Sequence, residues 1–235
     1  MANSLPQFSV DDKGAVDVWE TSVEVADGHY QMDTPFKSEH PNFPDNRSVA
    51  KKRLQSLTNR FPRALELHAK YKYGIQELLD KGYAVPEQEI TASPGRTWYL
   101  PHHNVVNENK PELLQIVFDC AVTCGGTLLN KEVLQGPDFP NNLLGVLLRF
   151  REEQVAVMRH IEGMFHQVRV SLNEHDVLFL WWKNGEISGE VEVCRMCVHL
   201  FGGMWSLSRA SFALSRVADD YRMDLPEETI LYKLS

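Results

Sequence analysis

The stretch Val155-Ala-Val-Met-Arg-His160-Ile-Glu-Gly-Met-Phe-His-Gln-Val-Arg-Val170 determines how the rest of the sequence is interpreted. Residues 154–159 have the apolar character of a buried strand, which we expect to end near His160. Glu162 would share a face with His160 if the strand continued, because side chains two positions apart on a strand point the same way. We expect the chain to turn there, so Glu162 is not expected to act together with His160.

This stretch resembles the first catalytic motif of a reverse transcriptase, in particular that of BEL/Pao-type LTR retrotransposons. The family pattern is an apolar strand followed by Asp-Ile-Glu-x-Met-Phe-His-Gln-Val, and His160 stands where the family has its aspartate. Further blocks resemble the family in the same order, at residues 27–31, 44–54, 97–103, 116–121, 134–138, 145–151, 179–182, 195–202, 211–214 and 218–220. The chain is therefore similar to a retrotransposon polyprotein over the N-terminal half of its reverse transcriptase.

The resemblance and the hydrophobic pattern together predict an α+β fold in three parts. Residues 1–45 are polar and lack a sustained helical period, which predicts an extended or loosely ordered arm. Residues 46–85 are expected to form a helical connector, because apolar residues recur at spacings of three and four. The first helix would bury a face of Ala50, Leu54, Leu57 and Phe61, and the second a face of Ala64, His68, Tyr71, Ile75, Leu78 and Leu79. Residues 86–235 are expected to form a truncated reverse transcriptase region, comprising the fingers and part of the palm of a right-hand polymerase.

Local signals refine this expectation. Asn46 or Ser48 is suited to cap the first connector helix, and Lys81-Gly82 is a typical helix stop. We expect Lys183-Asn-Gly185 to form the turn of a hairpin. Strands are predicted at residues 98–100, 113–118, 154–159, 178–183 and 191–200, and helices at residues 143–151 and 206–221. Leu207, Ala210, Leu214 and Val217 lie along one face of the last helix.

Composition fits an ordinary globular protein with reduced thiols. The 235 residues are 43% hydrophobic and 24% charged. No apolar run approaches the ~20 residues that cross a bilayer, and the N-terminus does not have the pattern of a signal peptide. Four cysteines in a chain of this size favour an intracellular, cytoplasmic location without a membrane partner.

The charge balance argues against strong nucleic-acid binding. The net charge is −8, whereas affinity for nucleic acid comes largely from neutralising phosphates. The dense basic region consists of Lys51, Lys52, Arg53, Arg60, Arg63, Lys70 and Lys72. We interpret it as a solvated helix face.

The resemblance implies that His160 occupies a catalytic position without its chemistry. Nucleotidyl transfer uses two metal ions held by carboxylates, and Mg²⁺ strongly prefers oxygen ligands. An imidazole at this position removes a ligand and a negative charge. The family's Tyr-x-Asp-Asp hairpin is expected some tens of residues after Asp219-Asp220, which we interpret as helix-end surface acids, and the sequence to Ser235 lacks it. Mg²⁺ is the cofactor of intact relatives, and no cofactor is expected for this chain.

The resemblance also assigns nucleotide-binding positions to Phe165, Gln115, Phe201 and Gly202. Leu113 and Gln115 stand where the family has a Lys and an Arg that meet the triphosphate, so the cationic clamp is missing. Phe165 matches the aromatic residue that packs under the sugar. An aromatic side chain there is equally consistent with a core residue, and both interpretations stay open.

A zinc site is the competing interpretation of the cysteines. Cys120, Cys124, Cys194 and Cys197 have loosely suitable spacing. However, Cys194 and Cys197 fall in a predicted strand, where residues three apart point to opposite faces. We therefore expect buried or half-buried thiols and no metal site.

The sequence thus predicts a catalytically inactive fragment of a retrotransposon RNA-directed DNA polymerase. The alternative is a captured non-catalytic module that binds nucleic acid or particles of related elements. A third interpretation is an enzyme completed by carboxylates from a second chain. An RNA or DNA primer–template is the partner of intact relatives. Self-association is expected because an incomplete palm sheet would leave Trp181, Trp182 and Trp205 partly uncovered.

We predict that the chain binds a primer–template no more tightly than about 10⁻⁶ M at physiological salt, because the net charge is negative and the two clamp cations are missing. Fluorescence anisotropy over a range of salt concentrations measures this affinity. A nanomolar dissociation constant would contradict the prediction and favour the binding-module alternative.

Overall fold

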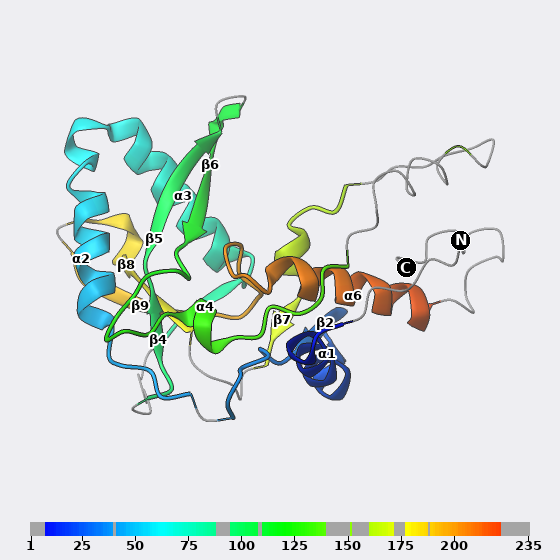
Figure 1. The fold of residues 1–235 in the computed structure, drawn as a ribbon. Coiled ribbons are helices and arrows are strands. Elements are labelled where there is room, and N and C mark those ends of the chain that lie inside the picture. Colours follow the sequence, from blue (N-terminus) through cyan, green and yellow to red (C-terminus); the bar gives the residue numbers. More distant parts are fainter. Residues whose placement is uncertain are drawn as a thin grey trace.

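A computed structural model describes residues 8–39, 41–87, 95–107, 110–139, 151, 160–171, 177–187 and 189–221. Helices alternate irregularly with small mixed sheets, so the fold is α+β as predicted (Figure 1). The predicted strand at residues 154–159 and all but the last residue of the predicted helix at residues 143–151 lie outside the described residues.

The expectation of an extended arm over residues 1–45 was wrong for its central part. Residues Val10–Ser22 form helix α1, followed by strands β1 (Glu24–Ala26) and β2 (His29–Met32). The Ser9 hydroxyl accepts a hydrogen bond from the Asp12 N–H, and the Asp12 carboxylate accepts one from the Ser9 N–H. This capping box fixes the start of α1.

The helices predicted within residues 46–85 are present as α2 (Arg47–Thr58), the short 3₁₀ helix η1 (Phe61–Arg63) and α3 (Leu65–Asp80). Ala84 and Val85, at the end of this range, belong to strand β3 (Ala84–Pro86) instead. The predicted apolar face is buried at Ala50, Leu54, Leu57 and Phe61. Helix α3 stops where predicted, and Gly82 follows with a positive φ of 67° that suits glycine.

A four-stranded sheet lies at the centre of the larger half of the molecule, which also contains α2 and α3. Its order is β3 (Ala84–Pro86), β9 (Val191–Met196), β8 (Val177–Trp182) and β4 (Trp98–Leu100). Strand β8 pairs antiparallel with β9 and parallel with β4. Its side chains alternate between two cores, because neighbouring residues on a strand point to opposite faces.

One of these cores lies between the sheet and α2, and the other is the main core, which includes α3. Leu178 and Leu180 pack with the buried face of α2. Phe179 and Trp181 belong to the main core, which also contains buried residues of α3. The sheet is therefore buried on both faces, which explains the nearly continuous apolar run in β8.

The predicted Lys183-Asn-Gly185 turn is confirmed as a short 3₁₀ segment, η3 (Lys183–Gly185). Asn184 and Gly185 have positive φ values of 53° and 71°, the conformation that an Asn-Gly pair adopts readily. The Gly185 carbonyl lies 2.8 Å from His68 Nε2, and this hydrogen bond ties the turn to α3.

Strands β5 (His102–Asn107) and β6 (Lys110–Phe118) form a separate antiparallel hairpin that stands out from the body next to α3 (Figure 1). Gly74 of α3 allows this approach, because a Cβ there would lie 3.2 Å from the Ile116 side chain. A short helix, α4 (Leu129–Glu132), follows the hairpin.

A smaller core packs the first described helix, α1, against the last. Strand β2 pairs in parallel with β7 (Arg169–Val170), which follows the 3₁₀ helix η2 (Met164–Gln167). Helix α6 (Ser206–Asp220) packs here against α1, with the Phe212 and Trp19 rings 5.5 Å apart.

The predicted apolar face of α6 was only partly right. Ala210 is buried, but Leu207 and Val217 are exposed. The helix instead buries Ser206, Ser208 and Arg209. The Arg209 guanidinium donates to the carbonyl of Met32, and the Ser206 hydroxyl donates to the carbonyl of Leu200. Backbone acceptors thus make a polar buried face stable where the sequence suggested an apolar one.

The expectation that Trp181 and Trp205 would be partly uncovered was wrong. Both side chains are at least 97% buried, and the Trp181 indole N–H donates to Glu192 at 3.0 Å. Only Trp182 is half-buried. Self-association itself stays a prediction.

Asn46 connects α2 to the edge of the sheet. Its buried side-chain amide donates to the Tyr99 carbonyl at 2.7 Å, and its oxygen accepts from the Tyr99 N–H at 2.8 Å. Asn46 lies at the N-cap position, but neither it nor Ser48 caps the helix through its side chain. The Asp45 carboxylate accepts from the Arg47 N–H instead. The Asn46 side chain thus takes the place of a neighbouring strand.

We predict that Asn46→Ala lowers the unfolding free energy by roughly 2–5 kcal/mol, because it leaves two buried backbone groups of Tyr99 without partners. Asn46→Asp should also destabilise at neutral pH, where its carboxylate meets the Tyr99 carbonyl, and should recover part of the loss in acid. Urea unfolding measures both effects. Asn59→Ala, at an exposed residue, is the control. If Asn46→Ala lowers the unfolding free energy no more than Asn59→Ala does, the prediction is contradicted.

Candidate functional site

His160 lies on the surface at the start of the turn that leads into η2. Its side chain is exposed, and so is that of Glu162. The chain turns at Glu162-Gly163, as expected, where Gly163 has a φ of +57°. The Glu162 carboxylate lies 3.6 Å from the Lys81 ammonium. Glu162 therefore faces the cation at the C-cap of α3.

Three of the predicted nucleotide-binding residues come together. Phe165 of η2 is half-buried, and its ring centroid lies 5.4 Å from that of Phe201. The His199 ring lies 6.3 Å from Phe165. Phe201 is 40% exposed, so one side of this aromatic cluster is open to solvent.

Gly202 seats the loop of this cluster against the end of β6. Its φ is +121°, and a Cβ there would lie 2.5 Å from the Phe118 carbonyl oxygen. Both the backbone conformation and the lack of space require glycine at this position. The loop that carries Phe201 is thereby fixed between η2 and β6.

Gln115 does not join the aromatic cluster. It is exposed on β6 opposite Val105, three residues before Phe118. Three residues of strand correspond to about 10 Å, so Gln115 lies well away from the Gly202 contact.

The other acidic and thiol candidates make contacts typical of structural residues. Asp220 accepts from the Tyr30 hydroxyl at 2.7 Å and pairs with Arg216 at 2.9 Å, as a helix-end surface acid. The Tyr30 hydrogen bond and Arg216 lower the pKa of Asp220. Burial raises the pKa of the buried thiols Cys120 and Cys194 to about 12.

Cys124 and Cys197 are half-buried, so the expected burial of the four thiols is confirmed. Over the described ranges, no group of three or more His, Cys, Asp or Glu residues is placed to hold a metal ion.

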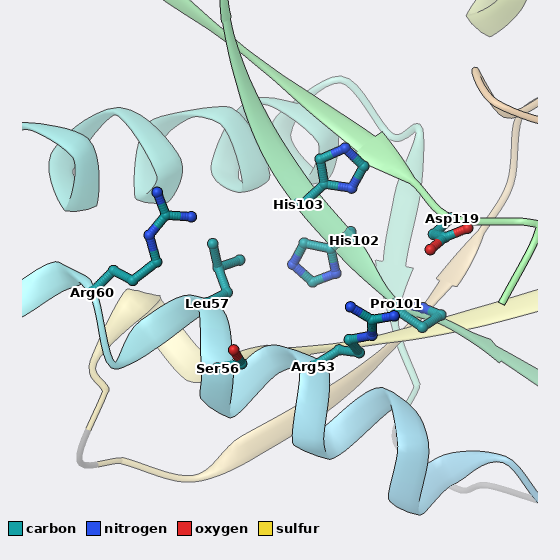
Figure 2. Close-up of a pocket in the computed structure, with 8 residues that line it drawn as sticks. All are labelled: Arg53, Ser56, Leu57, Arg60, Pro101, His102, His103 and Asp119. Atoms are coloured by element: carbon teal, nitrogen blue, oxygen red, sulfur yellow. The ribbon is translucent and has the colours of Figure 1, made fainter.

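A groove between α2 and the start of β5 was not anticipated from the sequence. It has a volume of about 190 Å³ (Figure 2). We call it the α2–β5 groove, and its lining residues are Arg53, Ser56, Leu57, Arg60, Pro101, His102, His103 and Asp119. Most cations of the basic region are exposed, as the interpretation of a solvated helix face implied, but Lys70 is half-buried. Two of the exposed cations, Arg53 and Arg60, line this groove.

The floor of the groove is neutral. His102 is buried, its ring stacks on Tyr71, and its Nε2 lies 2.7 Å from the Tyr71 hydroxyl. The tautomer of His102 decides which of the two groups donates this hydrogen bond. Burial lowers the pKa of His102 to about 4, so it carries no charge at neutral pH.

No protein-family model matches this sequence, and no curated protein matches it. Among the helices of the described residues, none has both the length and the apolar character needed to span a bilayer.

We predict that acid destabilises the fold through His102. Its pKa is about 4 when folded and 6.5 ordinarily, so the unfolded chain binds an extra proton between these pH values. The unfolding free energy should fall as the pH drops from 6.5 towards 4, by up to about 1.4 kcal/mol per pH unit from this residue. Buried His199, whose pKa is also lowered, adds to this slope.

Urea unfolding at several pH values measures the slope. His102→Gln should reduce it, because the variant has no imidazole at this position that could take up the extra proton on unfolding. Equal slopes for wild type and His102→Gln would contradict the prediction.

Proposed function

We propose that the chain is a reverse transcriptase-like polymerase fragment, similar to BEL/Pao-type polyproteins, that does not catalyse nucleotidyl transfer by itself. One observation carries the proposal. Phe165 and Phe201 lie far apart in the sequence, the resemblance assigns both to one nucleotide pocket, and their rings are in contact at 5.4 Å. A chance likeness in two separate motifs would not require this contact.

The expected loss of catalysis rests on the residue at position 160. The family mechanism needs carboxylates that bind two metal ions and offset their charge. The His160 imidazole is neutral in its unprotonated form and suits softer metals than Mg²⁺. Glu162 does not restore the missing carboxylate, because it lies in the turn and faces Lys81.

The proposed nucleotide pocket also lacks its cations. An Arg and a Lys would hold a triphosphate through charge-assisted hydrogen bonds. The matching positions are Gln115, which is exposed and uncharged, and Leu113. An open aromatic cluster without these cations could stack a base or sugar but would hold a triphosphate weakly.

We predict no template-dependent dNTP incorporation by the wild-type chain with Mg²⁺ or Mn²⁺, because the metal-binding carboxylate is replaced by His160. A primer-extension assay on RNA and DNA templates tests this outcome. Incorporation that His160→Ala abolishes would contradict the loss of catalysis.

A second measurement tests the family assignment separately. If position 160 corresponds to the metal-binding aspartate, His160→Asp should increase Mn²⁺ binding, measured by electron paramagnetic resonance. His160→Asn matches the aspartate in size without its charge and should not increase binding. Equal Mn²⁺ affinity of the two variants would count against the assignment, whatever the primer-extension result.

A further inference from the structure

We propose that the α2–β5 groove is a phosphate-binding site, in which Arg53 and Arg60 hold the phosphate oxygens and Ser56 contributes a hydroxyl group. This inference does not depend on the assignment to a polymerase family. It rests on the lining of the groove, on the freedom of its two guanidinium groups, and on its balance of charge.

The donors reach one cavity from α2 and from the turn that follows it. Arg53 and Ser56 lie three residues apart on α2, which places them on one helical face. Arg60 lies in the turn between the end of α2 at Thr58 and η1, and it also lines the groove. Figure 2 shows Arg60 and Arg53 at either end of this row, with Ser56 and Leu57 between them.

Within the described residues, the two arginines of the groove have no acidic partner. In the part of the chain that the structure describes, no carboxylate lies within 4.0 Å of Arg53 or Arg60. Other arginines do have such partners, namely Asp27 for Arg169, Glu87 for Arg195 and Asp220 for Arg216. The Arg53 and Arg60 guanidinium groups therefore remain available to bind an external anion.

The opposite wall adds one negative charge. Asp119 lines the groove, and its carboxylate accepts from the Ala121 N–H at 3.0 Å. His102 adds no charge, because burial lowers its pKa to about 4. Two fixed cations thus face one carboxylate, and the groove favours an anion more weakly than it would without Asp119.

Phosphate fits these donors and this space. A guanidinium group presents parallel N–H donors that match two oxygens of a phosphate, and two such groups can approach a tetrahedral anion from different sides. The groove volume of about 190 Å³ is many times the ~10–15 Å³ that a single bound water requires. The phosphate could belong to a free phosphate compound or to a polynucleotide backbone.

Inorganic phosphate is the first probe. In nitrogen-15 NMR spectra of the full chain, added phosphate should shift the Nε–H signals of Arg53 and Arg60. Arg63 is exposed on η1 and does not line the groove, so its signal serves as the internal reference. Shifts equal at all three arginines, or absent from Arg53 and Arg60, would overturn the proposal.

Charge variants provide the second test. Arg53→Gln and Arg60→Gln should each weaken phosphate binding about three- to tenfold, the range expected for the loss of one hydrogen bond of ordinary net strength. Asp119→Asn keeps an oxygen for the Ala121 N–H and removes the opposing charge, so it should strengthen binding. Arg63→Gln makes the same charge change outside the groove. An effect of Arg63→Gln equal to that of Arg53→Gln would show general electrostatics and reject the site.

A single-stranded oligonucleotide distinguishes the two sources of phosphate. If the oligonucleotide displaces inorganic phosphate from Arg53 and Arg60 and binds more tightly than phosphate does, the polynucleotide backbone is the ligand. The slope of log Kd against the logarithm of the salt concentration should then fall by about 0.7 for each arginine removed. Phosphate binding without oligonucleotide competition identifies a free phosphate compound. Both results support the phosphate site.

Discussion

The pair of hydrogen bonds between the Asn46 side chain and the Tyr99 backbone is the constraint on which the larger half of the molecule depends. Strand β4 is an edge strand, paired on one side by β8. On the other side the Asn46 amide fork satisfies the N–H and C=O of Tyr99, which would otherwise invite pairing with another chain. The same contact holds the start of α2 against the sheet.

The position of α2 in turn creates the α2–β5 groove. Leu57 packs into the main core while its neighbours Arg53 and Arg60 face the groove. The opposite wall is fixed by the hydrogen bond from the Asp119 N–H to the Pro101 carbonyl at 2.8 Å. A displacement of α2 would thus separate the two arginines from the wall that they face.

Sequence reasoning succeeded where burial follows a simple period. The faces of α2 and α3 were predicted because large apolar residues recur at helical spacing. Helix α1 was missed because its buried residues are essentially Ala15 and Trp19, although the Ser9 and Asp12 capping box was present in the sequence. On α6 the apolar pattern misled, because Arg209 is buried against backbone carbonyls that only the tertiary fold supplies.

The candidate sites show the same division. The Phe165 and Phe201 cluster was predicted through a family resemblance, since neither residue signals its partner by spacing. The groove could not be predicted, because its arginines and the His102 floor come from segments far apart in the sequence. The packing of α2 on the sheet brings these segments together. Local patterns determine elements, whereas a site between elements depends on how the whole chain packs.

The parallel pairing of β2 with β7 has a consequence for how the chain acquires its structure. Gln31 pairs with Arg169 and Met32 with Val170, so the N-terminal strand meets its neighbour across most of the sequence. Contacts between such distant segments slow folding, because a long loop must close before they form. During synthesis, α2 and α3 can form as soon as they leave the ribosome, whereas β2 must wait until β7 has emerged. The pairing of β2 with β7 is therefore a late step of folding.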